Sequence, residues 1–257
     1  MGIVLTIVII LLVFPYVAGP LLLWISGSRI PPTHVDVVEA TAAMPKQAES
    51  HFWKTTHFFA ANGFERAGDR VRESNHSGLA AYKQLWRNPE TGEAALVGVF
   101  VKESDAEFSN TFVAFMHECG DDALLSTSNF NPGARTLLDP AGTSKVVVAS
   151  QDLAELRALH NAHVAEHTGS AVRPLRVRDA LTLCQQLEAA SRATALVKKR
   201  FRNDGDSLRI TLWGAVSSIW INLPPLKGRY DQQEREAVER LRLANAASPH
   251  NRHSRAA

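Results

Sequence analysis

The first 28 residues constrain the chain more than any other part, because they contain no Asp, Glu, Lys, Arg or His. Between Ile3 and Ile25, only Thr6 and Tyr16 carry a hydroxyl group. A helix of this length covers about 34 Å, and the hydrocarbon core of a bilayer is about 30 Å thick. The run therefore predicts a transmembrane anchor over residues 1–28.

A cleavable signal peptide is the weaker interpretation of this run. Such a peptide begins with basic residues and has an apolar stretch of about 7–15 residues, whereas no Lys or Arg precedes this longer run. Arg29, Lys46 and Lys54 follow it, and positive residues favour the cytoplasmic side. We therefore expect a signal-anchor in the cell (inner) membrane, with the main domain in the cytoplasm.

Composition argues against nucleic acid as a general partner and against a disulfide-stabilised fold. The chain has 28 Lys and Arg against 26 Asp and Glu, a formal net charge of +2, which is too small to predict a nucleic-acid partner. Its two cysteines, Cys119 and Cys184, lie far apart and form no CxxC pair, so no disulfide framework is predicted. Cys184 lies beside an apolar helix face, where we expect a buried structural thiol.

The segment after the anchor is predicted to be a juxtamembrane linker over residues 29–48, because Pro31-Pro32 favours extended chain. A helix is predicted over 49–61, with Asn62-Gly63 as its end. Apolar runs separated by turn residues then predict about five strands, over 79–87, 94–102, 108–117, 123–130 and 145–150. Short turns between consecutive strands favour an antiparallel meander, because parallel neighbours need long crossovers.

Two helices are predicted after the strands. The first, over residues 151–167, has Asp152 and Glu155 in its opening turn, as the helix dipole prefers. The second, over 177–202, carries apolar residues spaced by three and four. Because the central strands are too apolar to leave one face in water, a helix should cover that face. Residues 49–203 therefore predict a soluble α+β domain.

A second apolar stretch covers residues 207–225. It includes 17 uncharged residues between Arg209 and Lys227, the lower limit for a membrane-spanning helix. Three interpretations stay open: a second span, a helix lying in the membrane interface, and a core element of the soluble domain. We favour a membrane-associated helix.

Basic and aromatic residues around this stretch support contact with a membrane surface. Clustered Lys and Arg side chains are attracted to an anionic leaflet by about 1 kcal/mol each, and Trp favours the headgroup depth. The predicted membrane-surface contacts are Lys198, Lys199, Arg200, Arg202, Trp213 and Trp220. The remaining residues, 226–257, predict a charged helix and a disordered basic tail.

Candidate metal chemistry is confined to three histidines of one predicted helix. His160, His163 and His167 have the spacing i, i+3, i+7, which places three imidazoles on one helix face and within reach of a shared ion. The alternative is that they continue the packing stripe of Leu153 and Leu156. No HExxH, GxSxG, Walker or GxGxxG pattern accompanies them.

His117-Glu118-Cys119 is a second candidate site, because it brings a base, an acid and a thiol to one strand end. Side chains alternate along a strand, so His117 and Cys119 should face one way and Glu118 the other. A reactive cysteine also needs a cationic partner to lower its pKa. We expect a hairpin turn here rather than a catalytic site.

These observations predict an α+β fold that has an N-terminal transmembrane helix, an antiparallel meander packed with helices, and a second membrane-associated helix. The predicted function is a membrane-anchored, non-catalytic module that binds a protein partner or the bilayer surface, without a cofactor. The alternative is a membrane-anchored metal-dependent enzyme or metal sensor that binds a transition metal at the three histidines. The expected partners are the lipid bilayer, a protein partner or a second copy through membrane helices, and not nucleic acid.

Overall fold

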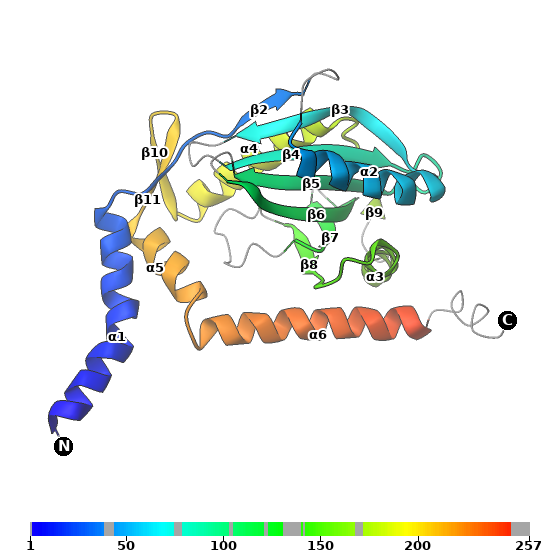
Figure 1. Cartoon of the computed structure of the whole chain (residues 1–257). Helices are drawn as coiled ribbons and strands as arrows, with labels where there is room; N and C mark the ends of the chain where they lie inside the picture. The colour runs from blue at the N-terminus through cyan, green and yellow to red at the C-terminus, as the bar shows by residue number, and fades with distance from the viewer. Residues whose placement is uncertain are drawn as a thin grey trace. The chain divides into compact units, whose positions relative to one another are not determined.

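The computed structural model describes most of the chain, and Figure 1 labels its helices and strands. The described residues are 2–38, 44–74, 79–102, 105–120, 123–130, 140, 142–167 and 172–247, with side chains except at 2–12, 105–109 and 123. The predicted tail over 248–257 lies outside them. The chain forms two compact units: Met1–Pro32, Pro132–Ala141 and Ala189–Gln233 make the first, and Thr33–Asn131, Gly142–Glu188 and Glu234–Ala257 make the second.

The second unit is built on an eight-stranded sheet with the order β2-β3-β4-β5-β6-β7-β8, in which β9 pairs with β6. Neighbours from β2 to β7 are antiparallel, which confirms the predicted meander over its first four strands. The predicted fifth strand, β8, is instead parallel to β7. The long connection between β7 and β8 permits this, because a parallel pair needs a long crossover. The strands are β2 (His34–Val37), β3 (Glu65–Ser74), β4 (Leu79–Arg87), β5 (Ala94–Lys102), β6 (Asp105–Cys119), β7 (Ala123–Ser128), β8 (Ser144–Val147) and β9 (Val172–Arg173).

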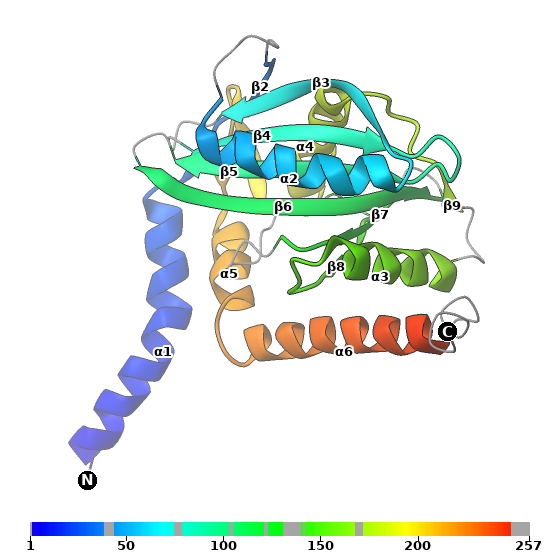
Figure 2. The same ribbon diagram turned by 45° about the vertical axis from the view of Figure 1, so that its right-hand side comes forward.

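Helices cover both faces of this sheet. Figure 2 shows α2 (Lys46–Ala61) in front of the sheet and α4 (Ala180–Val197) behind it. The helix α3 (Leu153–Glu166) packs on the same face as α2, and the end of α6 (Leu226–Ala247) runs beside α3. The prediction of an α+β fold is confirmed, and burial is more complete than expected because the sheet has no wet central face.

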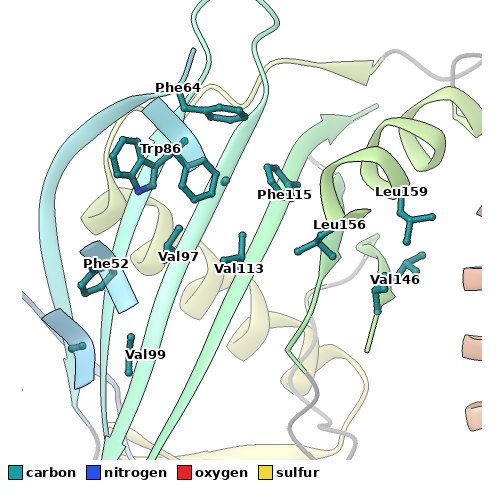
Figure 3. Close-up of a cluster of buried hydrophobic side chains, with 14 of the residues drawn as sticks. Phe52, Phe64, Trp86, Val97, Val99, Val113, Phe115, Val146, Leu156 and Leu159 are labelled. Atoms are coloured by element: carbon teal, nitrogen blue, oxygen red, sulfur yellow. The ribbon is translucent and has the colours of Figure 1, made fainter. Parts of the chain in front are cut away.

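The strand β5 shows how two cores arise from one run of apolar residues. Val97 and Val99 point into a cluster that includes Phe52 of α2 and Leu156 of α3 (Figure 3). Leu96 points the other way, into a cluster with residues of α4. Since side chains alternate along a strand, an uninterrupted apolar run serves both faces.

Gly98, in the middle of β5, has a specific steric role. A Cβ atom at this position would overlap the ring of Phe112, which lies across it from β6. Phe112 also packs against Phe100 and Phe130 with tilted rings, at centroid distances of 5.4 Å in both pairs. The glycine therefore makes room for an aromatic cluster on the α4 side of the sheet.

The first unit contains two helices and a small sheet. The helix α1 (Gly2–Ile25) leads into β1 (Arg29–Ile30), and β10 (Phe201–Asp204) and β11 (Ser207–Ile210) form a hairpin that β1 extends in the order β1-β11-β10. The helix α5 (Leu212–Ile221) follows, with the Thr211 hydroxyl accepting from the backbone N–H of Gly214. A Cβ on Gly214 would overlap the carbonyl oxygen of Arg200. Glycine thus lets α5 begin directly against the hairpin.

The predicted membrane-spanning helices are not supported. Over the part of the chain that the structure describes, no helix combines the length and the apolar character that crossing a bilayer requires. The predictions of a transmembrane anchor, a membrane protein and an inner-membrane location are therefore wrong.

The second apolar stretch also differs from its prediction as a membrane-associated helix. It divides into the strand β11 and the ten-residue helix α5, which is only about 15 Å long. Leu208 and Ile210 of β11 are buried in the core of the first unit, together with Ala215 of α5. Of the three interpretations considered, the core element of a folded domain is the one that agrees with the structure.

Candidate functional site

Two histidines from distant parts of the chain meet at the interface between α3 and the sheet. The Nδ1 atom of His117, on β6, lies 2.9 Å from the Nε2 atom of His160, on α3. The two rings stack with centroids 5.2 Å apart and an interplanar angle of 21°. Both side chains are buried, so this pair is part of the core.

The chain of hydrogen bonds continues across β7 to β8. The Thr127 hydroxyl lies 3.2 Å from Nδ1 of His160 and 3.0 Å from Nδ1 of His163. The Nε2 atom of His163 then lies 3.0 Å from the hydroxyl oxygen of Ser144. We call His117, His160, Thr127, His163 and Ser144 the histidine relay.

The local sequence explains why two relay histidines share one helix face. A spacing of three residues places His160 and His163 side by side on α3. The helix begins at Asp152, whose carboxylate accepts the backbone N–H groups of Ala154 and Glu155, a typical N-cap. The helix face is therefore set by a defined start, and Thr127 lies between the two rings.

A buried ion pair provides a second attachment for α3, separate from the histidine relay. Glu93, only 2% exposed, accepts from Nε and Nη2 of Arg157 at 2.9 Å each. Arg157 also donates to the side-chain oxygen of Asn62, and its guanidinium lies 5.0 Å from the centroid of the Phe64 ring. The pair thus joins α3 to the β4–β5 hairpin and the end of α2.

The relay histidines are all shifted toward the neutral form. Burial lowers the pKa of His117, and it lowers the pKa of His160 well below its ordinary value, with the two neighbouring histidines adding to the effect. Burial, followed by the charges of His167 and Arg240, lowers the pKa of His163 to about 4. At neutral pH the relay therefore contains three uncharged imidazoles.

When all three imidazoles are uncharged, the hydrogen bonds of the relay can be arranged in two opposite donor-to-acceptor directions. Each neutral ring has one N–H donor and one acceptor nitrogen, and each hydroxyl can donate once and accept. All donors can therefore point from His117 toward Ser144, or all from Ser144 toward His117. The relay is therefore a continuous chain of hydrogen bonds whose direction can reverse as a whole.

The three histidines predicted to bind a metal have different surroundings. Both ring nitrogens of His160 and His163 lie within hydrogen-bond distance of relay partners, and Nδ1 of His167 lies 2.9 Å from the carbonyl oxygen of His163. In the described residues, no group of three or more His, Cys, Asp or Glu side chains is arranged to hold a metal ion. The metal site stays a prediction, and hydrogen bonds occupy the positions that metal bonds would take.

The contact between Ser144 and His163 has the spacing of a nucleophile and its base. Two features weaken that interpretation. The pKa of His163, about 4, makes it a poor base at neutral pH. Its other nitrogen contacts the Thr127 hydroxyl, which cannot stabilise an imidazolium as a carboxylate does.

The residues His117-Glu118-Cys119 do not form a single site. The expected alternation is seen, because His117 joins the relay while the Glu118 carboxylate accepts from the backbone N–H of Arg176 at 2.7 Å and pairs with its side chain at 3.2 Å. Cys119 is partly exposed and Cys184 is buried, as predicted, and both are free thiols. Burial raises the pKa of Cys184 to about 12, which makes it unreactive.

The residues predicted to contact a membrane surface lie in the first unit. Lys198, Lys199 and Arg200 follow the end of α4, and Arg202 lies on β10. Trp213 and Trp220 lie on α5, where Nε1 of Trp220 donates to the carbonyl oxygen of Tyr16 at 2.8 Å. Their contact with a bilayer surface stays a prediction.

The same unit carries a large exposed apolar surface on two neighbouring helices. The helices meet where Ile219 of α5 packs against Gly19 of α1. A Cβ atom added to Gly19 would lie 3.5 Å from the Ile219 side chain. The exposed fractions of the large side chains around this contact run from 42% to 64%. We call them the α1–α5 surface: Val13, Phe14, Val17, Leu21, Leu22, Trp24, Ile25, Leu212, Trp213 and Trp220.

A hollow of about 390 Å³ lies in the second unit, near the start of α2. Lys46 and Lys102 are the charged residues of its lining, and Tyr82 contributes an aromatic wall. The other lining residues are Pro45, Gln47, Ala80 and Val101. Two exposed lysines give the opening a positive character, which no sequence pattern indicated.

Comparison with known proteins found no matching family model, no similar curated protein and no similar solved structure. The fold and the geometry of these sites therefore carry the functional proposal.

Proposed function

We propose that the chain is a non-catalytic module that binds a protein partner through the α1–α5 surface. The supporting observation is the exposure of ten large apolar side chains on two neighbouring helices. Single exposed apolar residues are ordinary, but a contiguous patch of several hundred Å² is typical of an interaction site.

The size of the surface suits a specific protein interface. A large apolar side chain at half exposure presents roughly 80–100 Å², so ten of them present on the order of 900 Å². One side of a standard interface buries about 800 Å². Covering this area removes apolar atoms from water at about 25 cal/mol per Å², which supplies a strong driving force for association.

The chemistry of the surface limits the partner. No charged residue occurs between Val13 and Ile25, or between Leu212 and Trp220. A charged partner group placed there would lose its hydration without gaining an ion pair. We therefore expect a protein partner that presents an uncharged apolar surface, and Trp213 is the expected main contact because Trp residues often dominate binding energies.

Site-specific photo-crosslinking in the full-length chain tests this function. A photoreactive phenylalanine analogue replaces Trp213, which is 61% exposed, and in a matched control it replaces Trp53 of α2, which is 67% exposed. We expect position 213 to crosslink one discrete protein that position 53 does not. Trp213→Glu should abolish binding of that purified protein, whereas Trp53→Glu should not.

Three results would contradict the proposed function. Equal crosslinking from positions 213 and 53 would show that exposure alone determines the products. Crosslinks to lipid without protein would assign the surface to a bilayer. Unchanged binding of the purified partner by Trp213→Glu would place its contact elsewhere.

A further inference from the structure

We propose that the histidine relay is an acid switch, which releases α3 and the C-terminal half of α6 from the sheet when it takes up protons. The proposal is independent of the α1–α5 surface and concerns only the second unit.

The relay attaches the helix α3 to the main sheet. Each of its four hydrogen bonds joins a residue of α3 to a residue of the sheet. His160 contacts β6 and β7, and His163 contacts β7 and β8, so the bonds reach three neighbouring strands. Any change that breaks the relay therefore weakens the attachment of α3 to the sheet.

Proton counting shows how the relay responds to acid. One added proton can be accommodated while all four bonds persist, because a charged imidazole donates from both nitrogens. Two added protons, on His160 and His163, would aim two N–H groups at the Thr127 oxygen from either side. The Thr127 hydroxyl proton would then have no acceptor left in the relay, and two positive rings would flank one uncharged group.

The charges around the relay do not offset those protons. Arg240 of α6 lies close enough to disfavour a charge on His163, and Glu166 of α3 already pairs with Arg240 at 2.9 Å. His167, the C-cap residue of α3, adds a second titratable group that repels a charged His163. From the strands, Lys145 of β8 is a cation and Glu118 of β6 pairs with Arg176.

Acid has the opposite effect on the buried Glu93–Arg157 pair: protonation of Glu93 favours the folded chain. Burial raises the pKa of Glu93, so its protonation is easier in the folded chain than in the unfolded chain. This carboxylate therefore does not drive release directly.

The helix α3 and the end of α6 should leave the sheet together, because they contact each other. Leu156 and Leu159 of α3 belong to the same buried cluster as Leu241 of α6. Arg240 and Arg242 of α6 pair with Glu166 and Glu155 of α3, at 2.9 Å and 3.0 Å. The end of α6 is thus attached to α3, and loss of α3 from the sheet removes the support of both.

Hydrogen exchange measured by mass spectrometry on the full-length chain tests the switch. Protection factors, corrected for intrinsic exchange, are compared at pH 7.5 and pH 4.5 for peptides covering α3, the end of α6, and the β4–β5 hairpin. We expect at least a tenfold loss of protection in α3 and α6 at pH 4.5, with the hairpin retained. The same measurement on the double variant His160→Gln, His163→Gln should show no such pH dependence.

The controls keep the proposal falsifiable even where the double variant does not fold. His57→Gln changes an exposed histidine of α2 and should behave like the unmodified chain. Unchanged protection of α3 at pH 4.5 in the unmodified chain would overturn the proposal. Equal loss in α3 and in the β4–β5 hairpin would also overturn it, because that result describes global unfolding.

Discussion

The Nδ1 atom of His117 lies 2.9 Å from the Nε2 atom of His160, although 43 residues separate them in the chain. One of the two nitrogens must donate and the other accept, so the two rings share one proton. Through Thr127 and His163 the same constraint reaches Ser144. The direction of the hydrogen bond at His117 on β6 is thereby coupled to the directions of the hydrogen bonds at Thr127 on β7 and Ser144 on β8.

Stability should fall as the pH falls from about 6.5 toward 4. The pKa of His163 is about 4 in the folded chain and about 6.5 in the unfolded chain. Between these values the unfolded chain binds more protons, so acid favours unfolding. At 1.36 kcal/mol per pKa unit the loss from His163 is about 3 kcal/mol. Urea unfolding at pH 7.5 and pH 4.5 measures it, and a pH-independent midpoint would contradict the assignment.

Removing Glu93 should strongly destabilise the second unit. Glu93→Ala would leave Arg157 partly buried without its partner carboxylate, and breaking a buried pair costs about 3–5 kcal/mol. Glu90→Ala, which changes an exposed residue of the adjacent turn, is the matched control and should cost under 0.5 kcal/mol. Urea midpoints at pH 7.5 distinguish them, and equal effects would refute a special role for the pair.

Gly98→Ala should destabilise the chain because its new methyl group would overlap the Phe112 ring. Overpacking of this kind costs about 1–3 kcal/mol. The comparison is Gly228→Ala in α6, where no atom lies within 4 Å of the added Cβ and a helix favours Ala by about 1 kcal/mol. Thermal unfolding should therefore show opposite shifts. A neutral Gly98→Ala would mean that the Phe100, Phe112 and Phe130 cluster readjusts without cost.

The two thiols should differ in their reactivity toward iodoacetamide. Cys184 is buried and its pKa is about 12, whereas Cys119 is partly exposed. Because the thiolate is the reacting form and must be reached by the reagent, we expect Cys119 to be alkylated at least 100-fold faster at pH 8. Mass spectrometry of the native chain and of the urea-unfolded chain measures both rates. Similar rates in the native chain would show that α4 opens readily.

Much of the main sheet could be predicted from local patterns. The bounds of β4 and β5 agree with the predicted strands at 79–87 and 94–102, because their apolar runs end at clear turn residues. In that turn, the Asn88 side chain accepts from the backbone N–H groups of Glu90 and Thr91. Such short-range chemistry is written in neighbouring residues.

Other elements could not be found in this way. The strand β3 reads ERAGDRVRES, and Val71 is its one buried residue, so it lacks the apolar alternation by which strands are recognised. The hairpin of β10 and β11 was hidden because β11 continues into the apolar helix α5. The strand β11 pairs with β1 near the start of the chain, and β3 pairs with β2, which precedes α2. No local window contains these partners.

The shared helix face of His160 and His163, and the uncharged start of the chain, can be read from the amino-acid sequence alone. What these features contact depends on the folded chain. Folding brought His117, Thr127 and Ser144 to the two histidines from three different strands, and it divided the second apolar stretch between a strand and a short helix. The physical reason is that helix periodicity is a local property, whereas hydrogen-bond partners and burial depend on chain segments that meet only on folding.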